Sequence, residues 1–226
     1  MTCIYGAKYF TFTDKIVAKK RIEMVKIINN EIREHYINDI LDVGTAEDKN
    51  DKALNLIIKK LRKKGRIFKS LTIDNISDNY FKYKYKKSIT QNFSNQEYKK
   101  IKSDAVISAA TIEHVGSFNN QVKMVKNIIN LTKKIFFITT PNRFYPIEFH
   151  TKLPLIHWLP KRIHRFILSK LLNHKFLAKE KNLNLLCYQS INSMMSNFKQ
   201  DIHYKIIPIK LLGIVSNYII IGKKKI

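Results

Sequence analysis

The chain has 226 residues, a mass of 26.6 kDa and a formal net charge of +25 at pH 7, and its length fits one domain with a sizeable core. It opens without a secretory leader, and its apolar run 211–221 is too short to cross a bilayer, so we expect a cytoplasmic protein. Cys3 and Cys187 lack CxxC or CxxH spacing, which argues against a disulfide framework and a zinc site.

The positive charge is spread along the sequence. Lys predominates over Arg, and lysines occur in nearly every predicted helix and loop, as a biased genome composition produces. The densest runs, 59–64 and 223–225, fall at the end of a predicted helix and at the C-terminus. We therefore expect mainly compositional charge and only non-specific nucleic-acid binding. A specific nucleic-acid partner and a peripheral contact with an anionic membrane stay open as alternatives.

Apolar residues recur with the periods of helices and strands in alternation, and Gly65 stops one of the helical runs. This alternation predicts a parallel sheet covered by helices on both faces. The helix 14–32 would form an N-terminal cap within residues 1–35. In chain order, the pattern predicts helix 14–32, strand 40–43, helix 53–61, strands 66–73, 83–89 and 105–108, helix 122–129, strand 135–139, helices 162–172 and 189–198, and extended runs 202–209 and 215–222.

Polar residues and a glycine follow the ends of three predicted strands. Asp42 and Gly44 close the first strand, Asp74 follows the second, and Ser108-Ala109-Ala110 ends the clearest one. Because ligands of open α/β sheets bind at the carboxyl ends of the strands, these residues indicate a nucleotide-like ligand, with Asp74 as the ribose acceptor. A structural turn is the alternative for one glycine after one strand.

Four motifs follow one another in the order of a known family: Asp42-Val43-Gly44-Thr45, Thr90-Gln91-Asn92-Phe93, Thr111-Ile112-Glu113-His114 and Thr140-Pro141-Asn142. Together they resemble the class I S-adenosylmethionine-dependent methyltransferases, and the last two resemble the ubiquinone/menaquinone-methylase-like branch (methyltransferase type 11). The resemblance implies one domain over 1–226, with a Rossmann-like, doubly wound, mostly parallel α/β sheet and an antiparallel C-terminal edge hairpin.

The resemblance also implies S-adenosyl-L-methionine as cofactor. Its binding residues would be Asp42, Gly44, Thr45, Asp74, Asn92, Phe93, Ala109 and Glu113, with Asn92 and Phe93 at the adenine. Ala46 stands where the family usually has its second glycine, and Asn92 where an Asp is common. These two departures make a non-catalytic relative an alternative.

The segment 142–160 mixes prolines, aromatics, histidines and charged residues after a strand end, within a stretch 142–175 that we interpret as a substrate-facing lid. We expect His114 as general base, with His150 second, because imidazoles transfer protons near neutral pH. No metal is expected, since no HExxH motif occurs. The substrate-binding candidates are Asn142, Arg143, Glu148 and His157. The alternatives are a structural Glu113-His114 pair and a lid whose Phe149, Leu155 and Trp158 pack on the sheet.

The sequence therefore predicts an enzyme that methylates a small-molecule or lipid- or sugar-linked acceptor, at oxygen. An RNA-directed methyltransferase or a plain nucleic-acid-binding protein is the alternative that the charge favours.

Overall fold

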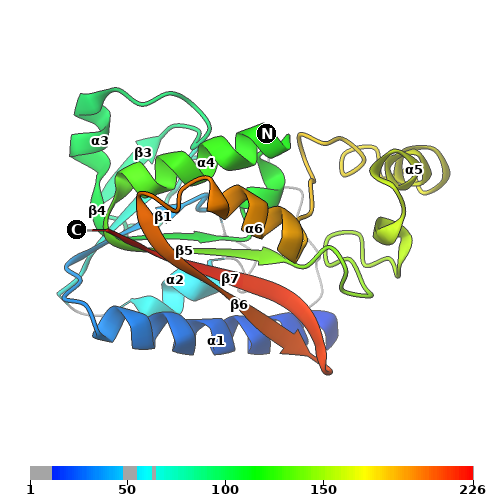
Figure 1. Cartoon of the computed structure of the whole chain (residues 1–226), viewed down its shortest axis with the longest axis horizontal. Helices are drawn as coiled ribbons and strands as arrows, with labels where there is room; N and C mark the ends of the chain where they lie inside the picture. The colour runs from blue at the N-terminus through cyan, green and yellow to red at the C-terminus, as the bar shows by residue number, and fades with distance from the viewer. Residues whose placement is uncertain (1–11, 48–54, 63–64, 226) are drawn as a thin grey trace. The chain divides into compact units, whose positions relative to one another are not determined.

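The computed structural model describes residues 12–47, 55–62 and 65–225, without the side chains of 12–17 (Figure 1). Cys3, Asp48, Ala53 and Leu54 lie outside these residues. The elements are α1 (Phe12–Arg33), β1 (Asp39–Val43), α2 (Leu56–Leu61), β2 (Ile67–Thr72), β3 (Tyr83–Lys86), α3 (Asn95–Ile101), β4 (Ser103–Ala109), η1 (Ile112–His114), α4 (Phe118–Leu131), β5 (Thr132–Pro141), η2 (Ile156–Trp158), α5 (Lys161–Phe166), η3 (Ile167–Leu171), α6 (Tyr188–Ser196), β6 (Ile202–Leu211) and β7 (Ile214–Lys224).

Seven strands form one mixed sheet in the order β3-β2-β1-β4-β5-β7-β6. β1 pairs in parallel with β2 and β4, β2 pairs in parallel with β3, and β6 and β7 pair antiparallel. All five residues of β1 are buried, as a strand covered on both faces requires. The predicted doubly wound sheet with a C-terminal hairpin is confirmed.

The chain forms two compact units. Unit 1 consists of Met1–Ala109 and Ile128–Phe137, and unit 2 of Ala110–Asn127 and Ile138–Ile226. The ends of β1 to β4 belong to unit 1. The 142–175 segment, α5, α6 and the β6–β7 hairpin belong to unit 2.

The core of unit 1 follows the predicted apolar pattern. Helix α1 buries Met24, Val25, Ile28 and Ile32, which recur at the spacing of one helix face. Figure 1 shows α1 and α2 side by side on one face of the strands. No helix in the described part of the chain is long and apolar enough to cross a membrane.

The amino ends of the strands carry paired carboxylates. Asp39 forms an ion pair with Lys69 and accepts a hydrogen bond from the backbone N–H of Asp104 at 2.9 Å. Burial acts to raise the pKa of Asp39, but the hydrogen bonds and the Lys69 charge outweigh it and lower the pKa. The side chain of Asp104 accepts from the N–H of Asn38 at 2.9 Å. These carboxylates therefore connect neighbouring strands.

The sequence analysis missed helix α3. Its N-terminus is a capping box, in which Ser94 Oγ accepts from the N–H of Glu97 at 3.2 Å and Glu97 Oε2 accepts from the N–H of Ser94 at 2.7 Å. The Ser-x-x-Glu spacing is the signal that could have found the helix. Strand β3 is shorter than predicted, and helix 162–172 divides into the α-helix α5 and the π-helical turn η3.

We expect Ser94→Ala to lower the free energy of unfolding by about 1 kcal/mol, since it removes the side-chain acceptor of the capping box. The measurement is urea unfolding at neutral pH. Ser196→Ala is a control, because the Ser196 hydroxyl donates to the carbonyl of Ser193 near the end of α6 and caps no helix N-terminus. An equal, negligible loss in both variants would contradict the cap.

Candidate functional site

In unit 1, the carboxyl ends of three strands meet at one edge. In the strand register Asp42 of β1 lies opposite Ser70 of β2 and Ile107 of β4. The N–H of Gly44 donates to the carbonyl of Leu71 at 2.9 Å. The hydroxyl of Ser108 donates to the carbonyl of Val43 at 3.1 Å.

The turn after β1 depends on its glycine. Gly44 has φ +84°, a left-handed conformation that is strained for a residue with a Cβ atom. Asn55 then fixes the backbone of Ala46 from two sides, because its Oδ1 accepts from the N–H at 3.3 Å and its Nδ2 donates to the carbonyl at 2.7 Å. The turn is therefore formed with Ala46 in the place of the family's second glycine.

Asp42 is a buried carboxyl group with few partners that would stabilise its charge. Its side chain is buried, and burial raises its pKa from the ordinary 3.8 to about 7. Within the described residues, the one side chain that donates to it is Thr45, whose Oγ1 lies 2.6 Å from Oδ2. Asp39, on the same strand, has a lysine partner instead. A buried carboxyl group with a raised pKa at a strand end is a group that a ligand with hydrogen-bond donors would satisfy.

The other predicted cofactor residues of unit 1 lie after β2 and β3. Asp74 is half-buried, and its N–H donates to Thr72 Oγ1 at 3.2 Å. Asn92 is exposed. The Phe93 ring packs against Tyr98 with 5.3 Å between centroids, and Lys87 Nζ lies 4.6 Å from its centroid. The structure thus places Asp42, Gly44, Thr45, Asp74, Asn92, Phe93 and Ala109 in unit 1, and Glu113 in unit 2.

A second group of candidates lies in unit 2 around η1. Gln121 Nε2 holds this turn by donating to the carbonyls of Ile112 and Asn184, at 3.1 and 2.8 Å. The Glu113 side chain is fully buried, and its Oε2 accepts from Thr140 Oγ1 at 3.1 Å. Its Oε1 accepts no hydrogen bond within the described part of the chain and lies 4.0 Å from His150 Nε2.

His114 and His150 face each other. Their Nε2 atoms are 3.1 Å apart, and their rings meet edge to face at 4.8 Å. His114 Nδ1 lies 2.6 Å from the carbonyl oxygen of Asn182, and His150 Nδ1 lies 2.6 Å from Glu148 Oε1. Since a carbonyl and a carboxylate only accept, each Nδ1 carries the hydrogen. We call Glu113, His114, Glu148 and His150 the histidine–glutamate cluster.

Glu148 orients His150. Its oxygens also accept from the backbone N–H groups of His150 and Thr151, at 2.9 and 2.6 Å. Burial acts to raise the pKa of Glu148, but the hydrogen bonds and charge of His150 outweigh it and place the pKa at about 2. Burial lowers the pKa of His114, against an opposing effect of Glu113. The sequence predicted Glu148 as a substrate ligand, whereas the structure places its carboxylate on the lid backbone and on His150.

The start of the lid is anchored by Asn142 and Arg143. The Asn142 amide donates to the carbonyl of Val215 at 2.8 Å. Arg143 donates from Nε to the carbonyl of His157 at 3.2 Å and from Nη2 to that of Leu159 at 3.0 Å. His157 is buried, and its Nε2 donates to the carbonyl of Tyr145 at 2.7 Å.

The lid is not packed as a purely structural element. Leu155 and Trp158 are 49% and 45% exposed, so these two do not bury themselves against the sheet. Phe149 does pack, with its ring stacked on Tyr145 at 5.2 Å. Apolar surface in contact with water is typical of a binding surface.

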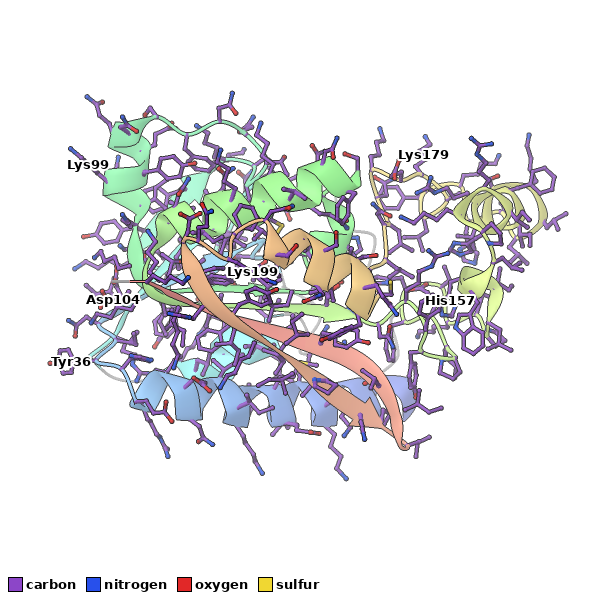
Figure 2. All side chains as sticks on the ribbon, viewed as in Figure 1. Tyr36, Lys99, Asp104, His157, Lys179 and Lys199 are labelled. Carbon is purple, nitrogen blue, oxygen red and sulfur yellow. The ribbon has the colours of Figure 1, made fainter. Side chains whose placement is uncertain are left out.

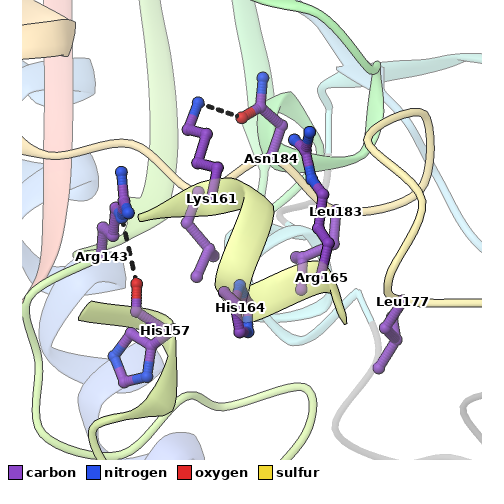
Figure 3. A pocket seen from close by; sticks show the side chains of 9 residues that line it. Arg143, His157, Lys161, His164, Arg165, Leu177, Leu183 and Asn184 are labelled. Carbon is purple, nitrogen blue, oxygen red and sulfur yellow. Dashed lines mark hydrogen bonds between the residues drawn. The ribbon is translucent and has the colours of Figure 1, made fainter. Parts of the chain in front are cut away.

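A small basic hollow, open to solvent, lies between the lid and residues 177–185 (Figure 3). Lys161 Nζ donates to Asn184 Oδ1 at 2.6 Å, and Arg165 pairs with Glu180 at 3.3 Å. Burial, with the charges of His157 and the arginines, lowers the pKa of His164 to about 4 despite Glu148. The hollow suits an anionic group. It is lined by Arg143, His157, Lys161, His164, Arg165, Leu177, Leu183, Asn184 and Leu185.

Sequence reasoning missed several residues of these sites. Thr140, Asn182, Asn184, Lys161 and His164 all contact a predicted site residue or line the basic hollow. The Thr140-Pro141-Asn142 motif could have indicated Thr140. The carbonyl of Asn182 carries no signal in the sequence, because any residue supplies a carbonyl.

Solved structures with this fold were found, whereas no protein-family model and no curated protein sequence matches the chain. Magnesium protoporphyrin IX methyltransferase from Synechocystis PCC 6803, solved with bound SAM, is 10% identical with a TM-score of 0.55, over 98% of this chain and 88% of that chain. N-methyltransferase NodS from Bradyrhizobium japonicum WM9 is 4% identical with a TM-score of 0.54, over 94% and 98%.

A third similar structure is the 1,6-didemethyltoxoflavin-N1-methyltransferase from Burkholderia thailandensis, solved with bound 1,6-didemethyltoxoflavin and S-adenosylhomocysteine. It is 6% identical with a TM-score of 0.56, over 92% of this chain and 79% of that chain. At such identities the likeness establishes the fold. The chain has the class I methyltransferase fold, and its chemistry has to be argued from its own residues.

Proposed function

We propose that the protein is an S-adenosylmethionine-dependent methyltransferase. The observation that carries the proposal is Asp42, a buried and poorly compensated carboxyl group beside the Gly44 turn, at the strand edge where this fold binds its ligands. The similar structures solved with SAM or S-adenosylhomocysteine support the choice of cofactor.

Unit 1 supplies most of the cofactor site in this proposal. Gly44 lets the backbone approach the ligand, and the carboxylates of Asp42 and Asp74 accept from its hydroxyl and amino groups. Asn92 and Phe93 would contact the adenine, and Thr45 and Ala109 would border the site.

Unit 2 supplies the groups that act on the acceptor. For methylation of a hydroxyl, the oxygen forms a bond to the methyl carbon, and the carbon–sulfur bond breaks with its electron pair passing to the sulfonium. The proton of the hydroxyl must leave. We assign this activation to His114 and His150, whose ring positions are fixed by Asn182 and Glu148.

The lid surface supports a lipid-linked acceptor with an anionic head, taken from an anionic membrane surface. Glu148 is the only acid between 142 and 176, and it is buried. More than half of the exposed large apolar side chains of the described residues lie in this stretch, a combination typical of interfacial segments. They are Phe144, Ile147, Leu155, Trp158, Leu159, Ile163, Phe166, Leu171, Leu172 and Phe176.

Cofactor binding is tested by calorimetry and thermal shift with SAM and S-adenosylhomocysteine. We expect a one-to-one complex with either ligand and a higher melting temperature. Absence of heat and of a thermal shift at millimolar ligand would overturn the proposed function.

We expect the protein to sediment with vesicles of phosphatidylglycerol and phosphatidylcholine but not with phosphatidylcholine alone. Phe166→Ala with Leu171→Ala should weaken this binding about tenfold or more, since each removes exposed apolar area. Leu212→Ala is the control, because Leu212 is 87% exposed outside the lid, between β6 and β7. If the control and the lid variants weaken vesicle binding equally, the lid does not contact the membrane surface.

An RNA-binding assay at several salt concentrations tests the nucleic-acid alternative. Figure 2 labels Lys99, Lys179 and Lys199, exposed lysines that belong to three different segments of the chain, so exposed positive charge is not confined to one element. Single-stranded RNA should therefore bind weakly and lose its affinity as salt rises. Tight binding of RNA at physiological salt would favour an RNA-directed methyltransferase over an enzyme that takes its acceptor from a membrane.

A further inference from the structure

We propose that Glu113, His114 and His150 form a binding site for a divalent transition-metal ion. Each offers one ligand atom, and the three atoms lie within 4.8 Å of one another. The Nε2 atoms of the two histidines are 3.1 Å apart, and Glu113 Oε1 lies 4.0 Å from that of His150.

The hydrogen atoms of the two rings point away from the space between them. Both Nδ1 atoms face groups that only accept, the Asn182 carbonyl and the Glu148 carboxylate, so each Nδ1 carries its hydrogen. In the neutral rings the two Nε2 lone pairs then face each other at 3.1 Å. Such an arrangement requires a proton or a cation between the nitrogens.

Glu113 favours the cation. Its side chain is fully buried, and its Oε1 accepts no hydrogen bond from the described residues. A buried carboxylate oxygen without a donor is costly to keep. A metal ion bound to Oε1 and to both nitrogens would satisfy all three atoms at once.

The distances fit an ion after a small adjustment. With metal–nitrogen bonds of about 2.1 Å, a separation of 3.1 Å corresponds to an angle of roughly 95° at the metal. Two ligand atoms on one ion are at most about 4.2 Å apart at this bond length. The Glu113 carboxylate therefore has to move by less than 1 Å relative to the rings.

The surrounding bonds are those of a metal site. Histidine ligands usually donate their second ring N–H to a carboxylate or a backbone carbonyl, which fixes the tautomer. Glu148 and the Asn182 carbonyl occupy these two positions. Two imidazoles and one carboxylate suit Zn²⁺, Fe²⁺, Mn²⁺ or Co²⁺ better than Mg²⁺ or Ca²⁺, which prefer oxygen ligands. Three protein ligands leave open positions.

The role of the ion, unlike its binding, rests on the proposed function. A hydroxyl of the acceptor bound at an open position would lose its proton to water more readily, because the ion lowers the pKa of a bound oxygen. The two histidines would then act as ligands of the ion rather than take the proton themselves.

The test uses the full chain, freed of metal by a chelator and titrated with Zn²⁺ by calorimetry and with Co²⁺ by visible absorption. We expect one equivalent with micromolar or tighter affinity. His114→Ala and His150→Ala should weaken it about a hundredfold, and Glu113→Gln and Glu148→Gln about tenfold. His203→Ala is the control, because this exposed histidine lies on β6 and should leave the affinity unchanged.

The metal site is overturned if the wild-type chain binds the ion with only millimolar affinity, or if the His150→Ala and His203→Ala proteins bind it equally well. A proton shared by the two rings would then explain their geometry. If an alanine variant fails to fold, the two Gln variants decide. SAM titrations of the same proteins separate the two proposals. If the chain binds SAM but neither Zn²⁺ nor Co²⁺, this inference alone is overturned. If it binds the metal ion but not SAM, only the proposed function is overturned.

Discussion

Asp42→Asn is expected to make the protein more stable and to abolish its binding of SAM. Burial raises the pKa of Asp42 to about 7, so above this pH the folded protein holds a poorly compensated charge. Asn keeps the size of the side chain and can accept the Thr45 hydrogen bond without the charge. The gain in unfolding free energy above pH 7 should be on the order of 3–4 kcal/mol.

The raised pKa determines how the stability gain of Asp42→Asn depends on pH. Because the folded pKa is raised above the ordinary 3.8, Asp42 contributes its full stability below about pH 4 and loses it as the pH rises through 7. The advantage of Asp42→Asn should therefore be absent near pH 4, grow between pH 4 and 7, and stay constant above. Urea unfolding across this range measures it, and calorimetry with SAM measures the loss of binding.

Asp39→Asn is the matched control, at the other end of the same strand. Its pKa is lowered by the hydrogen bonds and charge of Lys69, so its stabilisation is present above pH 4 and is lost as the pH falls. The substitution should cost on the order of 2 kcal/mol at pH 7 and leave SAM binding intact. If both variants lose stability to a similar extent, Asp42 is a structural carboxylate like Asp39. Asp48 lies outside the described residues and offers no such comparison.

Most of the fold could be predicted because its elements carry their own signals. The buried run of β1, the i, i+4 and i+8 spacing of Met24, Ile28 and Ile32, and the two extended runs at the C-terminus are local patterns. Helix α3 was missed because it buries only Ile101 and so shows no apolar stripe, although its capping box is visible.

The candidate site could be predicted less completely. Residue types at strand ends predicted Asp42 and Gly44, the family resemblance predicted Glu113, and the imidazoles of His114 and His150 made them candidates for the base. The partners of the last three come from far along the chain. His114 and the carbonyl of Asn182 are 68 positions apart, and His114 and His150 are 36 apart. Periodicity holds no information on such pairs. A search for HExxH would not find the proposed metal site for the same reason, because its ligands are not adjacent on one helix.

His150→Ala and Arg143→Lys are expected to affect the reaction in different ways. His150→Ala removes a group that acts on the acceptor oxygen, so kcat should fall about a hundredfold or more. Arg143→Lys keeps the positive charge in the basic hollow but cannot donate to the carbonyls of His157 and Leu159 as Arg143 does. It should raise KM for the acceptor about tenfold and change kcat less.

The assay follows transfer of a labelled methyl group from SAM into vesicles that contain extracted anionic lipids, with melting temperature and SAM affinity measured for the same proteins. SAM affinity should stay within about threefold in both variants, since Asp42 and the Gly44 turn are untouched. The exposed His203→Ala serves as the control for a general loss of histidine. Normal turnover with normal stability in the His150→Ala protein would remove the histidine–glutamate cluster from the reaction. A large loss of SAM affinity would instead place His150 among the cofactor ligands.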